Sequence, residues 1–356
     1  MTEEAGLRST ADSVPLDWEK VRVYLAAFGH RLDGNDRKPP RQFAGGLANL
    51  NYLIHLDGQP AVLRRPPMGE LPAGAYDMAR EFRILSRLPE ALPFIARGIH
   101  LCDDPSIIGQ RFQIIEFKSG MVIREHLPAD LAHRPEIGVR LSQVLLETIA
   151  AIHAVDTKAV GLDDLGKPEG FLARGVSGWR KRGLGAMEEG TERLHKDVGL
   201  WLEKNIVPEG KPGLLHNDFK LNNMILDADD FTPRAVVDWD QGTRGDPLFD
   251  FATLLSYWIH PDDPWAMHDM EQMPAVEACL CSRAEAVAAY GRISGRDTSN
   301  ILFHRVLAMY KLAVIFLQLG LRYRSGVTQE ARYAPLTGIG TGVLEFTHEI
   351  AQGRAF

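Results

Sequence analysis

The chain has 356 residues, which is enough to bury a sizeable core and to form two domains or one domain of two lobes. Hydrophobic residues make up 45% and charged residues 24%, and the net charge of −7 gives no electrostatic reason to expect a nucleic-acid partner. The three cysteines form no disulfide framework, and the polar first ten residues lack the basic and apolar regions of a signal peptide. We therefore expect a cytoplasmic protein with reduced thiols, two of which, Cys279 and Cys281, are predicted to lie on a helix.

The N-terminal third is predicted to contain short strands and two helices. Asp17 can cap the first helix, and Gly29 can end it. Asp57-Gly58 stands between two strand-like runs and is typical of a hairpin turn. The elements expected in chain order are a helix over residues 17–28, strands over residues 50–56 and 61–64, a helix over residues 76–88, and a strand over residues 112–117.

The pattern changes to helices after Gly120. Apolar residues recur at helical spacing from Leu141 to Ile152. The most apolar stretch, residues 301–321, is interrupted by charged side chains, which leaves an apolar run too short to span a membrane, so we expect a buried helix there. One exception is a predicted hairpin of the short strands 224–226 and 235–237. This order predicts an α+β fold with a strand-rich lobe over residues 1–117, a helical lobe over residues 118–356, and a cleft at their connection.

The most informative segment is the loop over residues 216–223, which leads into the strand 224–226. Asp218 stands five residues before Asn223, and Asp238 directly follows the strand 235–237, so the hairpin is expected to bring Asn223 and Asp238 together. Phosphoryl transfer needs a carboxylate that orients the attacking hydroxyl and oxygen ligands that hold Mg²⁺. We assign Asp218 to the first role, and Asn223 and Asp238 to the second.

This segment resembles the catalytic loop H-x-D-x-x-x-x-N of the aminoglycoside phosphotransferase and choline-kinase-like family. Asp238 resembles the family's metal-binding aspartate, and residues 245–250 (GDPLFD) resemble its G-D-P-x-x-D motif, in which Asp246 and Asp250 are expected to brace the loop. The resemblance implies a protein-kinase-like two-lobed fold, with ATP and Mg²⁺ as cofactors and a small-molecule hydroxyl as the acceptor. Four features agree in order and spacing, namely the loop, the strand that follows it, Asp238 and the G-D-P-x-x-D motif. Their agreement favours this interpretation over a chance acidic loop.

The resemblance also implies a nucleotide site in the first lobe. Gly45, Gly46 and Asn49 lie between expected strands, where glycines let the backbone approach phosphates. Arg64 stands where the family has a phosphate-binding lysine, and Glu81 on the next helix is its expected partner. An arginine can still bind phosphate through the N–H groups of its planar guanidinium. Strand alternation favours Arg64 over Arg65 as the residue that faces the cleft if Val62 shares its face. The alternative for Arg65 is a solvent-facing charge.

Three further residues, Glu116, Phe117 and Lys118, end the last strand of this lobe. The family fold implies that their backbone groups hydrogen-bond adenine.

Pieces of residues 40–320 resemble one branch of the family, which includes the kinase-like domain fused to certain acyl-CoA dehydrogenases. These pieces include residues 62–67 (VLRRPP) and residues 294–297 (SGRD). The branch implies a hydroxyl-bearing acceptor such as a hydroxyacyl-CoA. The alternatives are an antibiotic kinase of the aminoglycoside type and a catalytically silent nucleotide-binding module. A strip of acidic residues over 262–285 would suit a cationic acceptor, although a solvated acidic face explains it equally well.

Overall fold

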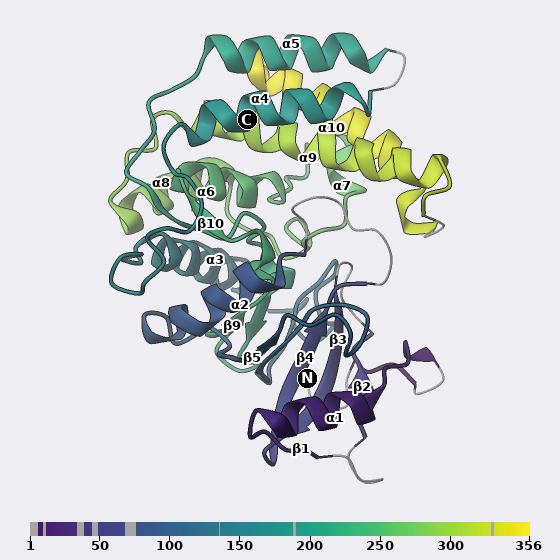
Figure 1. Ribbon diagram of the computed structural model, residues 1–356. Helices are drawn as coiled ribbons and strands as arrows, with labels where there is room; N and C mark the ends of the chain where they lie inside the picture. Colours follow the sequence, from purple (N-terminus) through teal and green to yellow (C-terminus); the bar gives the residue numbers. More distant parts are fainter. Residues whose placement is uncertain are drawn as a thin grey trace. The chain divides into compact units, whose positions relative to one another are not determined.

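The computed structural model describes residues 6–9, 12–33, 39–44, 49–67, 76–134, 136–187, 190–328 and 331–356 (Figure 1). Contacts divide the chain into two compact units. Unit one comprises residues 1–122, 158–163 and 223–242, and unit two comprises residues 123–157, 164–222 and 243–356. The segment 223–242, which we assigned to the helical lobe, thus makes its contacts within unit one. The division of labour between a nucleotide-binding and an acceptor-binding lobe stays a prediction.

The main element of unit one is an antiparallel sheet with the strand order β1-β3-β4-β6-β5, in which β2 pairs with β3. The predicted hairpin of β3 and β4 is confirmed, and positive φ angles of 53° at Asp57 and 82° at Gly58 close its turn. The strands are β1 (Leu32–Asp33), β2 (Arg41–Gln42), β3 (Leu50–Leu56), β4 (Gln59–Arg65), β5 (Gly98–Cys102) and β6 (Phe112–Glu116).

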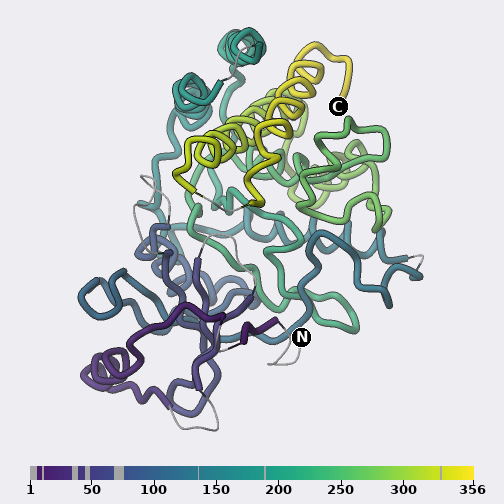
Figure 2. The backbone as a smooth tube through the Cα atoms, turned by 90° about the vertical axis from the view of Figure 1, so that its right-hand side faces the viewer, coloured from purple at the N-terminus to yellow at the C-terminus, as the bar shows by residue number. Residues whose placement is uncertain are grey.

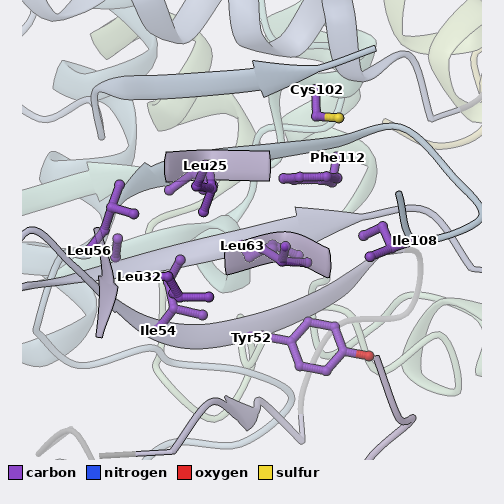
Figure 3. Packing of buried hydrophobic residues seen from close by; sticks show 12 residues of the cluster. Leu25, Leu32, Tyr52, Ile54, Leu56, Leu63, Cys102, Ile108 and Phe112 are labelled. Atoms are coloured by element: carbon purple, nitrogen blue, oxygen red, sulfur yellow. The ribbon is translucent and has the colours of Figure 1, made fainter. Parts of the chain in front are cut away.

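One face of this sheet forms the hydrophobic core of unit one (Figure 3). Tyr52, Ile54 and Leu56 alternate along β3 and point to this face, as strand geometry requires. Helix α1 (Trp18–Ala27) covers it with Leu25, which is fully buried, and the side chain of Asp17 accepts a bond from Lys20 N at the start of this helix. Helix α2 (Met78–Arg87) also belongs to unit one and packs against β5 and β6.

A second, smaller hairpin completes unit one. Strands β8 (Met224–Leu226) and β9 (Pro233–Val236) pair antiparallel, as predicted, and a 3-10 helix over Trp239–Gln241 follows. Met121 and Leu226 exchange two backbone hydrogen bonds of 2.7 and 2.8 Å, which attach this hairpin to the segment that follows β6.

Unit two is mainly helical (Figure 2). Helices α9 and α10 pack side by side, and α4 and α5 lie against them. Helix α9 is long and apolar enough to cross a membrane by length and composition, but its most apolar part is 83% buried within the fold, as predicted. The elements are α3 (Ile137–His153), α4 (Phe171–Leu184), α5 (Thr191–Lys204), α6 (Pro247–Ser256), α7 (Trp265–His268), α8 (Arg283–Ser294), α9 (Ile301–Arg324), α10 (Leu336–Ala351), and a two-stranded sheet of β7 (Gly213–Leu215) and β10 (Thr243–Gly245).

The prediction of a helix at Cys279 and Cys281 is wrong. Cys279 lies in a turn with a positive φ of 51°, and Cys281 lies in the loop before α8. Ser282 and Glu285 form a capping box that starts the helix just after these residues. Both thiols are free, as expected.

Candidate active site

The predicted site residues fall into two groups, one in each unit. Arg64, Glu81 and Asp238 form the first group, in unit one. Arg64 Nε donates to Glu81 Oε2 at 3.0 Å, and its Nη2 atom pairs with Asp238 Oδ1. One guanidinium therefore bridges two carboxylates that come from different elements of the unit.

Strand geometry explains why Arg64 and not Arg65 takes this position. The Arg65 side chain points to the other face, where its Nε donates to Pro66 O at 2.9 Å and its Nη1 to Ile108 O at 3.3 Å. Arg65 is 1% exposed, so the interpretation of Arg65 as a solvent-facing charge is wrong. The alternation of β4 thus places the two neighbouring arginines on opposite faces.

Burial and charge act in opposite directions on the Arg64–Glu81 pair. Burial alone would lower the pKa of Arg64, but Glu81, Asp238 and Asp240 raise it, and the guanidinium stays charged. Burial raises the pKa of Glu81 although Arg64 opposes this. Gln113, which the sequence analysis did not single out, donates to Glu81 Oε2 at 2.6 Å. The pairing of β6 with β4 places Gln113 directly opposite Arg64, and the sequence carried no signal for this register.

Asn223 and Asp238 flank the β8–β9 hairpin. Val237 N donates to Asn223 O at 2.9 Å, so the backbone places these two residues at the same end of the hairpin. Asp238 has a left-handed backbone with a φ of 69°, and its side chain is 29% exposed. An amide and a carboxylate oxygen are ligands that suit Mg²⁺. Among the described residues, no group of three or more His, Cys, Asp or Glu side chains could hold a metal ion, so the candidate metal site depends on this pair.

The remaining predicted nucleotide contacts lie elsewhere in unit one. Gly45 and Gly46 are outside the described residues. Asn49 is buried at the start of β3. Glu116 accepts bonds from Arg97 N at 3.2 Å and from Lys118 Nζ at 2.8 Å, and the Phe117 ring stacks near that of Phe43. These side chains serve local contacts, and the adenine-binding role of their backbone stays a prediction.

The second group surrounds Asp218 in unit two. Lys220 Nζ donates to both carboxylate oxygens of Asp218, at 2.8 and 2.9 Å, and Tyr257 Oη donates to Oδ1 at 3.0 Å. Asp218 N donates to His216 Nδ1 at 3.3 Å, so the histidine is bonded to the loop backbone. The Asp218 side chain is 29% exposed, whereas Lys220 is 10% exposed.

Asp250 holds the loop that carries Asp218. Its carboxylate accepts bonds from His216 N and Asn217 N, both at 2.7 Å, and from His153 Nε2 at 3.0 Å. Asp246 caps α6 by accepting from Leu248 N at 3.0 Å. Asp250 therefore braces the loop as predicted, whereas Asp246 binds the start of α6, Gly210 N and His304 Nε2 and makes no such bond to the loop.

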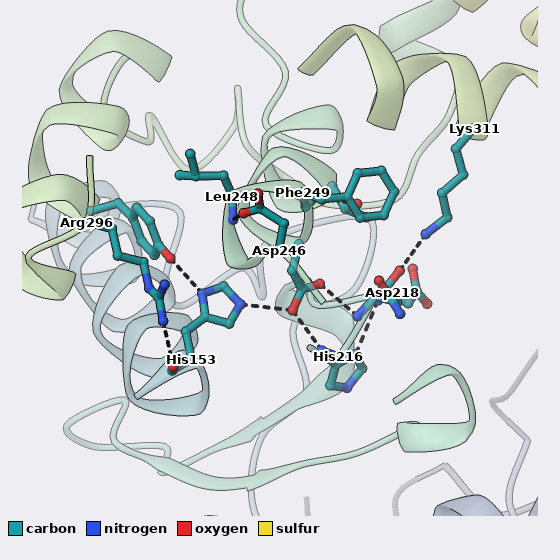
Figure 4. Close-up of polar contacts among 12 residues, drawn as sticks. His153, His216, Asp218, Asp246, Leu248, Phe249, Arg296 and Lys311 are labelled. Atoms are coloured by element: carbon teal, nitrogen blue, oxygen red, sulfur yellow. Dashed lines mark hydrogen bonds and ion pairs between the residues drawn. The ribbon is translucent and has the colours of Figure 1, made fainter. Parts of the chain in front are cut away.

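Lys311 reaches the same loop from α9 (Figure 4). Its Nζ donates to Asn217 O at 2.8 Å, and Asn217 has a positive φ of 65°. Burial lowers the pKa of Lys311, although Asp218 and Asp250 oppose this. Nothing in the sequence near residue 311 pointed to this role, because α9 is far from the loop along the chain.

The charges around Asp218 keep it ionised. Burial alone would raise the pKa of Asp218, but Lys220, His216 and Lys311 lower it, and the pKa lies below its ordinary value. A carboxylate that is ionised and 29% exposed can accept a proton from a hydroxyl group placed beside it.

Comparisons with known proteins show the family and the fold of the chain. Residues 40–289 match the phosphotransferase enzyme family. A protein of Ralstonia eutropha described as a candidate aminoglycoside phosphotransferase superposes with a TM-score of 0.78 and 24% identity, covering 95% of this chain and 99% of that chain. A thermostable mutant of the aminoglycoside phosphotransferase APH(4)-Ia, in ternary complex with ADP and hygromycin B, gives a TM-score of 0.60 at 16% identity, covering 93% of this chain and 98% of that chain.

Acyl-CoA dehydrogenase family member 11 of Gallus gallus is 27% identical over 328 residues. The match covers 88% of this chain and 38% of that relative's length.

Because the family match covers well over half of its residues, the chain belongs to the phosphotransferase enzyme family. The structural neighbours confirm the predicted α+β, kinase-like fold class. Both expected resemblances, to aminoglycoside phosphotransferases and to a part of certain acyl-CoA dehydrogenases, are confirmed. This membership makes the chain a phosphotransferase by family, and the structural neighbours share its fold.

Proposed function

We propose that the protein transfers the γ-phosphoryl group of ATP to a hydroxyl group of a small molecule and that it requires Mg²⁺. The observation that carries the proposal is Asp218, an ionised carboxylate held on a braced loop by Lys220 and Tyr257. The complex of a structural neighbour with ADP supports ATP as the phosphoryl donor.

Each residue has a role that its chemistry supports. Asp218 orients the acceptor hydroxyl and receives its proton as the oxygen bonds to the γ-phosphorus and the bond to ADP breaks. Arg64 contacts the phosphates with its guanidinium, which Glu81 orients. Asn223 and Asp238 supply oxygen ligands for Mg²⁺, which neutralises phosphate charge when it is bound.

For the acceptor, we propose a hydroxyacyl-CoA or a related anionic metabolite. Support comes from the relatives named as acyl-CoA dehydrogenase family members, which this chain matches over only part of their length. The acidic strip offers little support for a cationic antibiotic, because several of its members bond within the protein. Asp263 forms a buried pair with Arg283, Glu277 accepts from Leu127 N at 3.1 Å, and Glu285 caps α8.

The test is an ATP-consumption assay of the purified protein with Mg²⁺ and a panel of hydroxyacyl-CoAs, aminoglycosides and amino alcohols. We expect turnover with a hydroxyacyl-CoA, and turnover lower by roughly two to four powers of ten with Asp218→Asn. Turnover with aminoglycosides alone would replace the proposed acceptor with an antibiotic. Mg²⁺-dependent ATP binding without turnover on any acceptor would identify a silent module and overturn the proposed activity.

A further inference from the structure

Helix α6 contacts the catalytic loop at two places. Asp250 binds the backbone N–H groups of residues 216 and 217, and Tyr257, at the C-terminal end of the helix, binds the Asp218 carboxylate. Residues seven apart lie almost two full turns apart on one helix face. The same face of α6 therefore fixes both the backbone of the loop and the reactive side chain.

Tyr257 is well suited to this contact. The residue is 7% exposed, and its hydroxyl donates to Asp218 Oδ1 at 3.0 Å. The Lys220 ammonium lies 4.7 Å from the centre of the Tyr257 ring while it also binds both oxygens of Asp218. Each of Tyr257, Lys220 and Asp218 thus contacts the other two.

We propose that Tyr257 is a positioning residue of the phosphotransferase reaction, which holds Oδ1 of Asp218 so that the carboxylate meets the acceptor hydroxyl in one orientation. The inference rests on the proposed function. The proposal adds a residue that belongs neither to the catalytic loop, nor to the G-D-P-x-x-D aspartates, nor to the pair of candidate metal ligands. A neutral hydroxyl that donates to a carboxylate leaves the negative charge of the carboxylate in place, so Tyr257 orients the base without neutralising it.

The effect of removing the hydroxyl has a definite sign. The groups that act on Asp218 include Lys220 and His216 from the loop, Lys311 from α9, and Tyr257 from the end of α6. The pKa of Tyr257 is raised well above its ordinary value, first by burial and then by the charge of Asp218 and the hydrogen bond to it. The hydroxyl therefore keeps its proton and remains a hydrogen-bond donor at ordinary pH values. Loss of this donor destabilises the carboxylate, and the pKa of Asp218 rises.

The experiment compares Tyr257→Phe with wild type and with a matched control. The phenylalanine ring keeps the contact with Lys220 and removes only the hydroxyl. Tyr310→Phe is the control, because it deletes another buried tyrosine hydroxyl, which bonds to His195 Nδ1 at 2.7 Å within unit two. We expect Tyr257→Phe to lower kcat roughly 10- to 100-fold, to leave the KM for ATP nearly unchanged, and to move the acidic limb of the pH profile to higher pH. Tyr310→Phe should leave all three unchanged.

A second measurement does not depend on turnover. In protein labelled with ¹³C at the aspartate carboxyl carbon, the Asp218 signal is the one that disappears in Asp218→Asn. Its titration midpoint should be higher in Tyr257→Phe than in wild type and in Tyr310→Phe. An unchanged midpoint, or an unchanged kcat and pH profile in an enzyme that Asp218→Asn inactivates, would overturn the role of Tyr257. Full activity of Asp218→Asn would instead overturn the proposed function.

Discussion

The two units hold their key carboxylates in opposite electrostatic arrangements. In unit one, Arg64 is shared by Glu81 and Asp238, so one cation serves two anions. In unit two, Asp218 receives bonds from Lys220 and Tyr257, so one anion has several donors. The first arrangement leaves negative charge that a further cation can balance, and the second holds a single carboxylate ionised and in place.

This difference indicates how each group would respond to its ligands. A metal ion at Asp238 must share that carboxylate with Arg64 or displace it, whereas phosphate would attract the same guanidinium. Nucleotide and metal binding are therefore expected to rearrange the ion pairs of unit one. The Asp218 group is braced by Asp250 and Lys311 and is expected to keep its geometry.

The largest effect is expected from Asp218→Asn. This change removes the proton acceptor but keeps the shape of the side chain, so turnover should fall by roughly two to four powers of ten. ADP affinity and the melting temperature should stay close to those of wild type. Steady-state kinetics and nucleotide titration measure the two properties, and turnover near the wild-type level would contradict the assignment.

Loss of the brace should act on stability. Asp250→Ala leaves the N–H groups of residues 216 and 217 and the side chain of His153 without their buried acceptor. We expect a loss of about 3–5 kcal/mol in the free energy of unfolding, measured by denaturant titration. Asp197→Ala is the control, since its pair with Arg193 on α5 is exposed, and its effect should be small. Equal stabilities of the two variants would refute the role of Asp250.

The Arg64 bridge can be tested with two substitutions. Arg64→Met leaves Glu81 buried without its cation and removes the phosphate contact, so ADP affinity should fall roughly 10- to 100-fold. Arg64→Lys keeps the charge, and we expect affinity within about tenfold of wild type. Calorimetric titration with and without Mg²⁺ measures both. An Arg64→Met protein that binds ADP normally would show that the guanidinium serves only the fold.

A change at Gly120 should affect unit one alone. A Cβ atom there would lie 2.5 Å from Leu226 O and 2.6 Å from Ile225 Cγ2, both in the hairpin that carries Asp238. Gly120→Ala is therefore expected to destabilise the protein by roughly 1–3 kcal/mol. The titration of Asp218 should not change. A matched substitution, Gly58→Ala, meets no atom within 4 Å, and its cost should come from its positive φ of 82° alone.

The smallest and most gradual effect is the response of wild type to acid. Burial lowers the pKa of His153, and hydrogen bonds hold the pKa values of Asp246 and Asp250 below their ordinary values despite burial. In all three cases the unfolded chain binds more protons than the folded one, so stability should fall as the pH decreases from about 6.5 through the acidic range. Melting temperatures measured from pH 8 to pH 4 test this, and a flat profile would contradict it.

Local patterns were sufficient to predict much of this protein. The Asp57-Gly58 turn predicted the first hairpin, and the spacing from Asp218 to Asn223 and Asp238 predicted a loop and a hairpin with those residues at their ends. These features depend on neighbours in the chain, which a sequence displays directly. The helix predicted at Cys279 and Cys281 failed because the capping box at Ser282 starts α8 later.

By itself, the sequence determined the strand-rich and helical parts, the loop with its metal-binding candidates, and the resemblance to a phosphotransferase family. Only the tertiary structure decided that Lys311 donates a hydrogen bond to the loop and that Gln113 donates one to Glu81. It also decided that Arg65 is buried on the opposite face from Arg64. The physical reason is that these contacts join segments far apart in the chain. Hydrogen bonds and charges act over a few ångströms of space, and the fold alone brings such groups within that distance.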